Sequence, residues 1–372
     1  MLSSQHRTDV FVIGGGPAGL AAAIAARQKG LSVTLADGAA PPIEKPCGEG
    51  MMPETLAALR ALGIEIRPCE AQRLRGISFV QEDAQVFADF PEEQGIGMRR
   101  PLLHKRLVAR AADCGVQLLW KTPVRGIDTQ AVHLANQKIR ARWIIGADGQ
   151  GSRFRRWSAL EDTRRLKKRH ATRQHFRMQP WSEYTQFFWG THVQAYSTPV
   201  GPQEVCIVVM SELPEYADFG RALQELPQLR NHLRGAQLAS RERGAISVMH
   251  TLRNVQRGNF ALVGDAAGGI DAITGEGLRL AFRQALALAE AMMAGDLTHY
   301  ERAHRKLLRR PMLMGHLMLW LGRHPRIRAR FLRALEGSPE LFARLVAAHA
   351  GQGGPSDLLT TGASLGWRLL AT

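Results

Sequence analysis

The chain opens with an apolar strand pattern followed by an alanine-rich helix pattern. Val10–Ile13 is a β-branched and aromatic run, typical of a buried strand. Pro17–Lys29 predicts a helix that Gly30 ends, and Leu31–Ala36 predicts a second strand. Strand, helix and strand in this order predict a Rossmann-like unit with a parallel sheet.

Three glycines between the first strand and the helix have the G-x-G-x-x-G spacing. Such glycines allow a sharp turn, a close approach of the backbone to a pyrophosphate, and tight packing of the helix on the sheet. Asp37 ends the second strand, where a carboxylate accepts hydrogen bonds from a ribose 2′-OH, which favours FAD or NAD over NADP. A glycine-rich turn without a ligand is the alternative, and the complete order of elements disfavours it. The expected cofactor-binding residues of this unit are Gly14, Gly16, Pro17, Ala18, Gly19 and Asp37.

The middle of the chain changes character, because strand-like runs alternate there with breakers. This pattern predicts a mostly antiparallel sheet inserted into the nucleotide-binding domain, with one helix over Phe219–Arg234. Earlier in the chain, Ile77–Val80 and Gln85–Phe90 predict an antiparallel pair of strands. After the insertion, a buried strand ends in Gly264-Asp265, and a long alanine-rich helix follows as far as Met293.

These patterns divide the chain into three parts. We expect a discontinuous dinucleotide-binding domain at 1–155 plus 246–296, a substrate domain at 156–245, and a C-terminal helical region at 297–372. The predicted fold class is therefore α/β, with a Rossmann-like parallel sheet, an inserted antiparallel β domain and C-terminal helices.

The charge of the chain is unusual for its length of 372 residues. The net charge is +16, and much of it comes from arginines clustered at 153–177, 226–243, 253–257 and 302–333. An anionic ligand, an acyl carrier protein or an anionic membrane surface would suit this charge, and a merely solvated basic surface is the alternative. No nucleic-acid-binding motif accompanies the charge, so we do not expect nucleic acid as a partner.

Other sequence signals concern compartment and metals. The four cysteines form no C-x-x-C pair or zinc-like cluster, so no metal site is expected. The N-terminus lacks the apolar segment of a signal peptide, and no apolar run reaches the ~18 residues of a membrane span. We therefore expect a reduced, cytoplasmic protein. The apolar segment Pro311–Gly322 predicts a packed helix, with a basic amphipathic face on a membrane surface as the alternative.

Two further motifs join the early glycines. The middle motif is D-G-x-x-S-x-x-R, with Asp148 first and Arg155 last, and the late motif is G-D-A-A-G followed by T-G-E-G-L. Three such motifs in this order, over about residues 8–295, resemble the superfamily of FAD-dependent hydroxylases (group A flavoprotein monooxygenases) and geranylgeranyl reductases. The resemblance implies FAD as the cofactor, with NADH or NADPH visiting transiently, because no second dinucleotide motif is present.

The resemblance also assigns roles to residues. Gly264 and Asp265 would lie at the ribityl chain, and the helix opening at Gly275, Gly277 and Leu278 would stabilise the anionic reduced flavin with its N–H groups. Arg100 would lie near the flavin and the pyrophosphate. Asp148, together with Arg155, would link FAD binding with transient contact to the nicotinamide nucleotide.

One loop distinguishes the possible reactions. Lys45-Pro-Cys-Gly-Glu-Gly50 is similar to the K-P-C-G-G-G stretch of the geranylgeranyl reductases, whereas the halogenase signature W-x-W-x-I-P is absent. Cys47 and Gly48 are expected beside the flavin, and Cys47 and Glu49 are the candidate catalytic residues. In a reductase Cys47 would assist proton delivery, in a hydroxylase the loop would line the flavin, and a structural role in a tight turn is the third possibility.

The sequence thus predicts an FAD-dependent oxidoreductase. The first expectation is an NAD(P)H-dependent monooxygenase that hydroxylates an aromatic or lipophilic, polyketide-like substrate through a flavin C4a-hydroperoxide. The alternative is a reductase of double bonds in an isoprenoid or other lipid, and a flavin-binding redox sensor without turnover is the non-enzymatic option.

Overall fold

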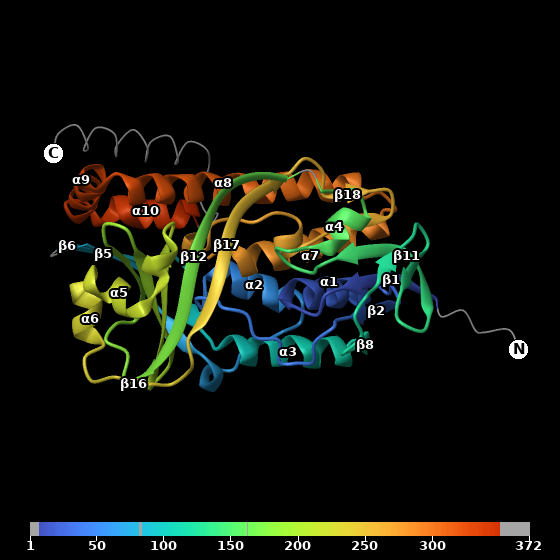
Figure 1. The fold of residues 1–372 in the computed structure, drawn as a ribbon, viewed down its shortest axis with the longest axis horizontal. Coiled ribbons are helices and arrows are strands. Elements are labelled where there is room, and N and C mark those ends of the chain that lie inside the picture. The colour runs from blue at the N-terminus through green and yellow to red at the C-terminus, as the bar shows by residue number, and fades with distance from the viewer. Residues whose placement is uncertain (1–6, 82–83, 162, 350–372) are drawn as a thin grey trace, which may run out of the picture.

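The computed structural model describes residues 7–81, 84–161 and 163–349, and it is built on two large sheets with helices around them (Figure 1). The first sheet has eight strands, and its central strands are parallel. Its main path is β18 (Gln256–Arg257), β19 (Phe260–Leu262), β11 (Lys138–Gly146), β1 (Arg7–Ile13), β2 (Val33–Ala36) and β8 (Gln117–Leu119). Two short strands, β9 (Gly126–Ile127) and β10 (Ala131–His133), extend this sheet from β11.

The centre of this sheet is the strand that opens the chain. In β1, Val12 pairs with Leu35 of β2 on one side and with Ile145 of β11 on the other. All three side chains are fully buried, as a strand covered on both faces requires. Helix α1 (Pro17–Gln28) follows β1 directly and packs against α3 (Arg100–Asp113) and α7 (Gly277–Met293), while α2 (Pro53–Ala61) also contacts α7.

The second sheet is mostly antiparallel. Its main path is β16 (Gln237–Leu238), β12 (Thr163–Arg177), β15 (Glu204–Ser211), β14 (Gln194–Gly201), β13 (Tyr184–Trp189), β5 (Gly76–Gln81) and β6 (Ala84–Asp89), and β17 (Arg243–Leu252) pairs with β12. The expected antiparallel pair of β5 and β6 is present. This pair lies on the second sheet, through a parallel contact of β5 with β13, although its residues precede the inserted segment in sequence.

Side chains that alternate along the strands bury both faces of this sheet. Cys206, Val208 and Met210 of β15 face one apolar cluster, which includes Phe331 and Phe342 from the C-terminal helices. The intervening Val205, Ile207 and Val209 face a second cluster, which includes residues of α5 (Phe219–Gln224) and α6 (Pro227–His232). The sheet is therefore the middle layer between two groups of helices.

The predicted single helix over Phe219–Arg234 is wrong, because the structure has two short helices there. Leu226 leaves the helical conformation, with φ −125° and ψ 67°, and Pro227 begins α6. A proline has no backbone N–H and disfavours a helical residue before it, so it starts a new helix rather than continuing the old one.

A small third sheet holds the loop that carries Cys47. It consists of β3 (Gly50–Met51), β7 (Gly95–Gly97) and β4 (Gln72–Leu74). Gly97 is pressed against β14, because a Cβ at this position would lie 1.7 Å from the carbonyl oxygen of Pro199. This contact fixes the loop before β3 between the two large sheets.

The C-terminal helices run along one edge of the molecule (Figure 1). They are α8 (Thr298–Arg323), α9 (Pro325–Glu336) and α10 (Pro339–His349). The hydroxyl of Tyr300 on α8 donates to the carbonyl of Leu262, 2.6 Å away, which attaches this helix to the end of β19. Among the described residues, no helix is both long and apolar enough to cross a membrane.

The packing of His304 on α8 predicts a pH dependence of stability. Burial lowers the pKa of His304 to about 4, from the ordinary 6.5, and outweighs a hydrogen bond with the backbone of Ala267. Between these values the unfolded chain binds a proton that the folded protein does not, so stability decreases as the pH falls. We expect the free energy of unfolding to drop by up to about 3 kcal/mol over this range through His304.

Chemical denaturation of wild type and His304→Gln at a series of pH values tests this expectation. The variant should lose less stability than the wild type as the pH falls from 6.5 toward 4. His299→Gln, which changes an exposed histidine of the same helix, serves as the control and should behave as the wild type. Parallel curves for wild type and His304→Gln would contradict the assignment.

Candidate functional site

The turn between β1 and α1 brings backbone segments into close contact. A Cβ at Gly14 would lie 2.4 Å from the carbonyl oxygen of Ala147, and a Cβ at Gly19 would lie 1.9 Å from that of Gly14. Gly14 also has a φ of +113°, which side chains disfavour. These two glycines therefore serve the packing of the protein itself.

Gly16 differs from its two neighbours in the motif. A Cβ there would meet no protein atom within 4 Å, its φ is −71°, and the residue lines a cavity. No contact within the protein explains this glycine. Gly16 is also the N-cap of α1 and its neighbour Pro17 opens the helix, with no side chain capping the free N–H groups. The arrangement keeps space and hydrogen-bond donors for a phosphate-containing ligand.

Asp37, the residue that follows β2, is hydrogen-bonded to the turn between β1 and α1. The Asp37 carboxylate accepts hydrogen bonds from the backbone N–H groups of Gly15, at 2.6 Å, and Ala39, at 2.7 Å. A carboxylate has about four acceptor positions, so capacity remains for the ribose hydroxyl that we predict as its ligand. His104, from the buried face of α3, lies 2.8 Å from the Gly15 carbonyl through Nε2, and burial lowers its pKa and keeps it neutral.

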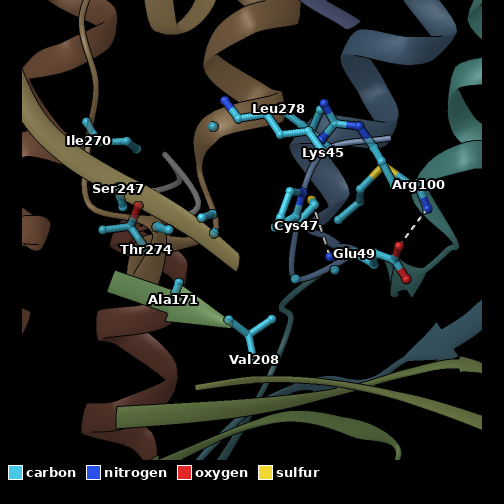
Figure 2. Close-up of a pocket in the computed structure, with 18 of the residues that line it drawn as sticks. Lys45, Cys47, Glu49, Arg100, Ala171, Val208, Ser247, Ile270, Thr274 and Leu278 are labelled. Carbon is cyan, nitrogen blue, oxygen red and sulfur yellow. Dashed lines mark hydrogen bonds between the residues drawn. The ribbon is translucent and has the colours of Figure 1, made fainter. Parts of the chain in front are cut away.

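The cavity beside this turn has a volume of about 300 Å³ and lies between the two large sheets. Most of the residues expected at the cofactor line it: Gly16, Pro17, Ala18, Cys47, Gly48, Arg100, Gly264, Asp265, Gly275, Gly277 and Leu278. Gly14, Gly19, Asp37 and Asp148 lie behind its wall. Arg100 enters the cavity from the start of α3, and its Nε has no hydrogen-bond partner within the described part of the chain (Figure 2).

The late motif supplies a second helix end to the cavity. Glu276, the N-cap of α7, makes no capping hydrogen bond, because its carboxylate pairs with Arg279. At Gly277 a Cβ would again meet no protein atom within 4 Å. As at Gly16, the free N–H groups of a helix start and an unexplained glycine face the same cavity. Two such helix ends on one cavity fit a dinucleotide such as FAD, with a phosphate group at one and the flavin at the other.

Asp265 forms an ion pair that sequence reasoning missed. Its carboxylate lies 2.5 Å from the Lys45 ammonium, in the loop that carries Cys47. Desolvation in the cleft opposes the ionisation of Asp265. However, the charge and hydrogen bond of Lys45, together with the charges of Arg100 and His250, outweigh it, so the pKa of this carboxyl lies below its usual range. The pair joins residues 220 positions apart, and no local pattern in the sequence indicates it.

The charged side chains of the middle motif are bonded to backbone groups of the protein itself. One Asp148 oxygen accepts from the N–H groups of Arg153 and Phe154 in the first turn of α4 (Arg153–Trp157), whose N-cap is Ser152. Arg155 is buried and donates to the carbonyls of Gln150 and Ala266, which joins the middle motif to the late one. Asp148 itself does not line the cavity, but Gly149 and Gln150 do. Its predicted contact with a nucleotide stays a prediction.

Cys47 and Glu49 point in different directions from one strained loop. Cys47 lines the cavity, and its Sγ accepts a hydrogen bond from the backbone N–H of Glu49 at 3.4 Å (Figure 2). Glu49 has a φ of +62°, unusual for a residue with a side chain. Gly48 between them is packed against Tyr196, whose ring would lie 2.1 Å from a Cβ there. Glu49 is also among the residues that line the cavity, but its carboxylate is fully buried and bonded to protein donors, whereas the thiol of Cys47 has no such network among the residues that the structure describes.

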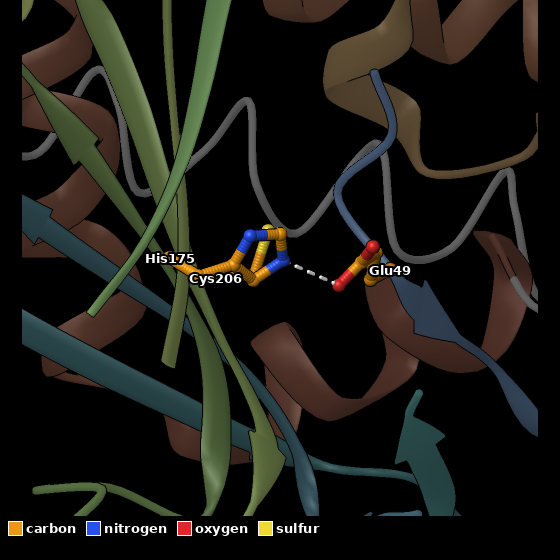
Figure 3. Close-up of side chains that lie close together, drawn as sticks. All are labelled: Glu49, His175 and Cys206. Atoms are coloured by element: carbon orange, nitrogen blue, oxygen red, sulfur yellow. Dashed lines mark hydrogen bonds and ion pairs between the residues drawn. The ribbon is translucent and has the colours of Figure 1, made fainter. Parts of the chain in front are cut away.

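The Glu49 carboxylate is surrounded by donors from two parts of the fold. Oε1 accepts from the backbone N–H of Arg100 at 2.9 Å and from Arg173 at 3.2 Å, and Oε2 lies 2.8 Å from Nε2 of His175 (Figure 3). Arg173 and His175 belong to β12, and the side chains of Glu49, Arg173 and His175 are fully buried. Arg173 also pairs with Glu44 at 2.6 Å. This network holds the left-handed conformation of Glu49 in place.

The same place has the composition of a metal site. One donor atom each of Glu49, His175 and Cys206 lies within 4.8 Å of the others (Figure 3). A bound cation would compete with the Arg173 guanidinium for the Glu49 carboxylate. In addition, burial raises the pKa of the Cys206 thiol well above its usual value, which keeps it protonated. Charge and protonation thus favour an ion-pair network over a metal site.

The wall opposite the glycine motifs is apolar. It includes Ile77, Phe187, Val208 and Met210 from the second sheet. A smaller cavity of about 60 Å³ shares Ile77, Phe187 and Thr274 with the first one and continues among the C-terminal helices, where Met314, Leu317 and Phe342 line it. The site therefore offers a polar half for a nucleotide and an apolar half for an extended hydrophobic group.

Known proteins resemble this chain in both sequence and fold. A family model described as "FAD binding domain" matches residues 7–309. A digeranylgeranylglycerophospholipid reductase from Thermoplasma acidophilum is 28% identical over 349 residues, which cover 85% of this chain and 86% of that protein. A menaquinone reductase from Mycolicibacterium smegmatis is 28% identical over 332 residues, covering 81% and 80%.

Solved structures confirm the expected fold class. A triple mutant of the flavin-dependent brominase Bmp2 superposes with a TM-score of 0.82 at 17% identity, covering 96% of this chain and 98% of that one. A geranylgeranyl bacteriochlorophyll reductase-like protein from Thermoplasma acidophilum gives a TM-score of 0.71 at 22% identity, covering 96% of each chain.

The contrast between Gly16 and Gly19 predicts separable effects. Gly16→Ala should leave the stability of the apoprotein unchanged but weaken FAD binding about 10- to 100-fold, the loss of one charge-assisted hydrogen bond of ~1.5–3 kcal/mol. Gly19→Ala should lower stability, because its Cβ would collide with the backbone of Gly14. Titration of apoprotein with FAD and thermal unfolding measure the two effects. Unchanged FAD affinity in Gly16→Ala would contradict the position we give to the ligand.

The buried charges predict a second result. Glu49→Gln leaves the fully buried Arg173 with only Glu44 as an ionic partner, so the free energy of unfolding should fall by about 3–5 kcal/mol. The double variant Glu49→Gln with Arg173→Met should recover part of this loss, since it removes the stranded charge. Denaturant unfolding of the two variants and the wild type measures the difference. A double variant less stable than Glu49→Gln would show that the pair does not act through its charge.

Proposed function

Because the chain belongs to the FAD binding domain family and is an FAD-dependent oxidoreductase, we propose that it reduces carbon–carbon double bonds in an isoprenoid or related lipid. The sequence favoured a hydroxylase, with this reductase as the alternative, and we now prefer the reductase. The observation that carries it is the position of Cys47, whose thiol lines the cavity where the glycine-rich half meets the apolar half. The names of the sequence relatives, reductases of a digeranylgeranyl phospholipid and of menaquinone, support it.

The cofactor would be held by groups that line the cavity and, at the ribose, by Asp37 beside it. The start of α1 at Gly16 would bind the pyrophosphate, Asp37 the ribose, and Asp265 a ribityl hydroxyl, while the start of α7 would face the flavin. When bound, FAD supplies the two electrons of the reduction. NADH or NADPH is our proposed source of these electrons, as a visiting rather than a resident molecule.

Cys47 would contribute a proton. Saturating a double bond takes two electrons and two protons. One proton would arrive with the electron pair that bound FAD supplies, and we propose that the Cys47 thiol at Sγ delivers the other to carbon. Glu49 would not touch the substrate, because its carboxylate is buried and occupied by protein donors. Its role would be to hold the loop so that Cys47 faces the cavity, which makes it a positioning residue.

The apolar half would hold the lipid. Ile77 and Phe187 lie at the junction of the two cavities, so a chain that passes between them would reach the C-terminal helices. An extended hydrocarbon of this kind buries apolar surface along its length, and this burial drives its binding. The enclosure also keeps water away from the reacting carbons.

Hydroxylation remains the second candidate, because the same enclosure suits it. Excluding water is equally necessary where a flavin enzyme activates oxygen, and the three motifs are those expected for the hydroxylases as well. In that case the Cys47 loop would only line the flavin, and the substrate would be an aromatic or lipophilic molecule.

Turnover without oxygen distinguishes the two reactions. The FAD-loaded protein, reduced with dithionite under anaerobic conditions, should convert a geranylgeranyl lipid, or the prenyl chain of menaquinone measured after its ring is reoxidised to the quinone, to products that mass spectrometry shows to have gained two hydrogens per reduced bond. Cys47→Ala should lower this rate about 10²- to 10⁴-fold, as expected for loss of a general acid, while the flavin absorbance stays unchanged. Cys69→Ala, which changes an exposed cysteine, is the matched control and should keep full activity.

Other outcomes would overturn the proposal. A product that gains one oxygen atom, formed only in air and equally well by Cys47→Ala, would identify the hydroxylase instead. Tight FAD binding with no turnover on any of these substrates, with or without air, would favour the non-enzymatic sensor.

A further inference from the structure

Helix α8 has two unlike faces. Its inner face is buried, through residues such as His304, Leu308 and Met318. Its outer face is a stripe at the spacing i, i+4, i+7, i+11, i+14 and i+18, which places the side chains on one line along a helix. The residues of this stripe, all exposed, are Arg302, Lys306, Arg309, Leu313, His316 and Trp320.

The stripe combines charge with large apolar side chains. Leu313 is 71% exposed and Trp320 is 44% exposed, in the half of the helix that follows the cationic residues. Isolated exposed apolar residues are ordinary on protein surfaces. Here two of them lie in line with three cations on one helix, so the stripe combines groups that attract anionic headgroups with side chains that can enter the interface below them.

The next helix extends the positive charge. Arg326, Arg330 and Arg333 of α9 are exposed at i, i+4 and i+7, whereas Phe331 and Leu335 on the other side are buried. Between residues 302 and 333 the sequence has ten lysines and arginines and no acidic residue. Helices α8 and α9 lie along the same edge of the molecule (Figure 1).

We propose that the outer stripe of α8, together with the exposed arginines of α9, docks on the surface of an anionic lipid bilayer. The cations match the negative headgroups, and Leu313 and Trp320 would enter the interface between headgroups and acyl chains. The contact is peripheral, because it uses one face of a helix whose opposite face is packed in the protein.

Only helix α8 would separate the docked membrane surface from the end of the smaller cavity. Met314, Leu317 and Met318 of α8 line the smaller apolar cavity, so the proposed membrane contact and the end of the cavity lie on different sides of the same helix. The link to a lipid substrate rests on the proposed function. The docking itself does not, and it can be measured without turnover.

Flotation of the FAD-loaded full chain with vesicles tests the docking. The protein should bind vesicles of phosphatidylcholine with phosphatidylglycerol, bind pure phosphatidylcholine much more weakly, and leave the anionic vesicles as salt is raised. Lys306→Glu with Arg309→Glu should weaken binding about 20-fold or more, since each cation near an anionic surface contributes about fivefold. Leu313→Glu with Trp320→Glu should weaken it even at low salt.

Matched controls show whether the position of a charge change on the stripe matters, or only the change in net charge. Lys138→Glu with Arg140→Glu makes the same charge change at exposed positions of β11, and Leu238→Glu adds a charge at a residue that is 63% exposed on β16. Both should bind vesicles as the wild type does. Unchanged FAD absorbance and thermal midpoint show that each variant is folded, and the stripe substitutions, being at exposed positions, should leave both unchanged.

Four results would overturn the proposal. Equal binding to neutral and anionic vesicles would show that the cations of the stripe do not direct the docking, and no binding at all would remove the membrane as partner. Vesicle binding by a chain ending at residue 349 but not by the full chain would indicate that the chain's own C-terminal segment covers the stripe. Light scattering that shows a dimer, lost in Leu313→Glu with Trp320→Glu while vesicle binding persists, would assign the stripe to a second copy.

Discussion

A single buried carboxylate holds the two halves of the site together. Glu49 accepts a hydrogen bond from the start of α3, which packs on the nucleotide-binding sheet, and bonds from Arg173 and His175 on the antiparallel sheet. The loop with Cys47 lies between them, so its position depends on both sheets at once. A buried charge of this kind is costly unless its partners are all present. The geometry of the cavity therefore depends on correct assembly of both halves.

Much of the fold and part of the site could be predicted from the sequence, and the reason is physical. The glycines, helix and strands of the first unit obey local rules of backbone geometry, so a short window of sequence determines them. The roles of Gly14 and Gly19 follow from contacts within that window and its neighbouring strand. That Gly16 and Gly277 lie at helix starts could be predicted for the same reason, and the structure places both in the lining of the cavity.

The features that could not be predicted are long-range pairings. The contact of β5 with β13, the ion pair of Lys45 with Asp265, and the network of Glu49 with β12 join residues far apart in the chain. Charged residues at such positions have no periodicity that distinguishes a buried pair from a solvated surface. The division of the predicted helix at Pro227 is different. The proline is present in the sequence, but apolar residues at helical spacing on both sides of it favoured one continuous helix. Asp148 shows that a motif residue can also serve the protein itself, here by accepting from the first turn of α4.

The long ribbon of β12 and β17 has a mechanical consequence. β12 has 15 residues and is paired with β17 from Thr163 to Arg173 and with β15 from His170 to Arg177, so it is supported by a neighbour along its whole length. Bending it would break several ladder hydrogen bonds together. The ribbon crosses the middle of the molecule (Figure 1). Because it is stiff, it resists a hinge motion of the two large sheets relative to each other. The two sheets therefore keep the same relative position while ligands enter and leave the site, and the loop with Cys47, held by both sheets, shares this rigidity.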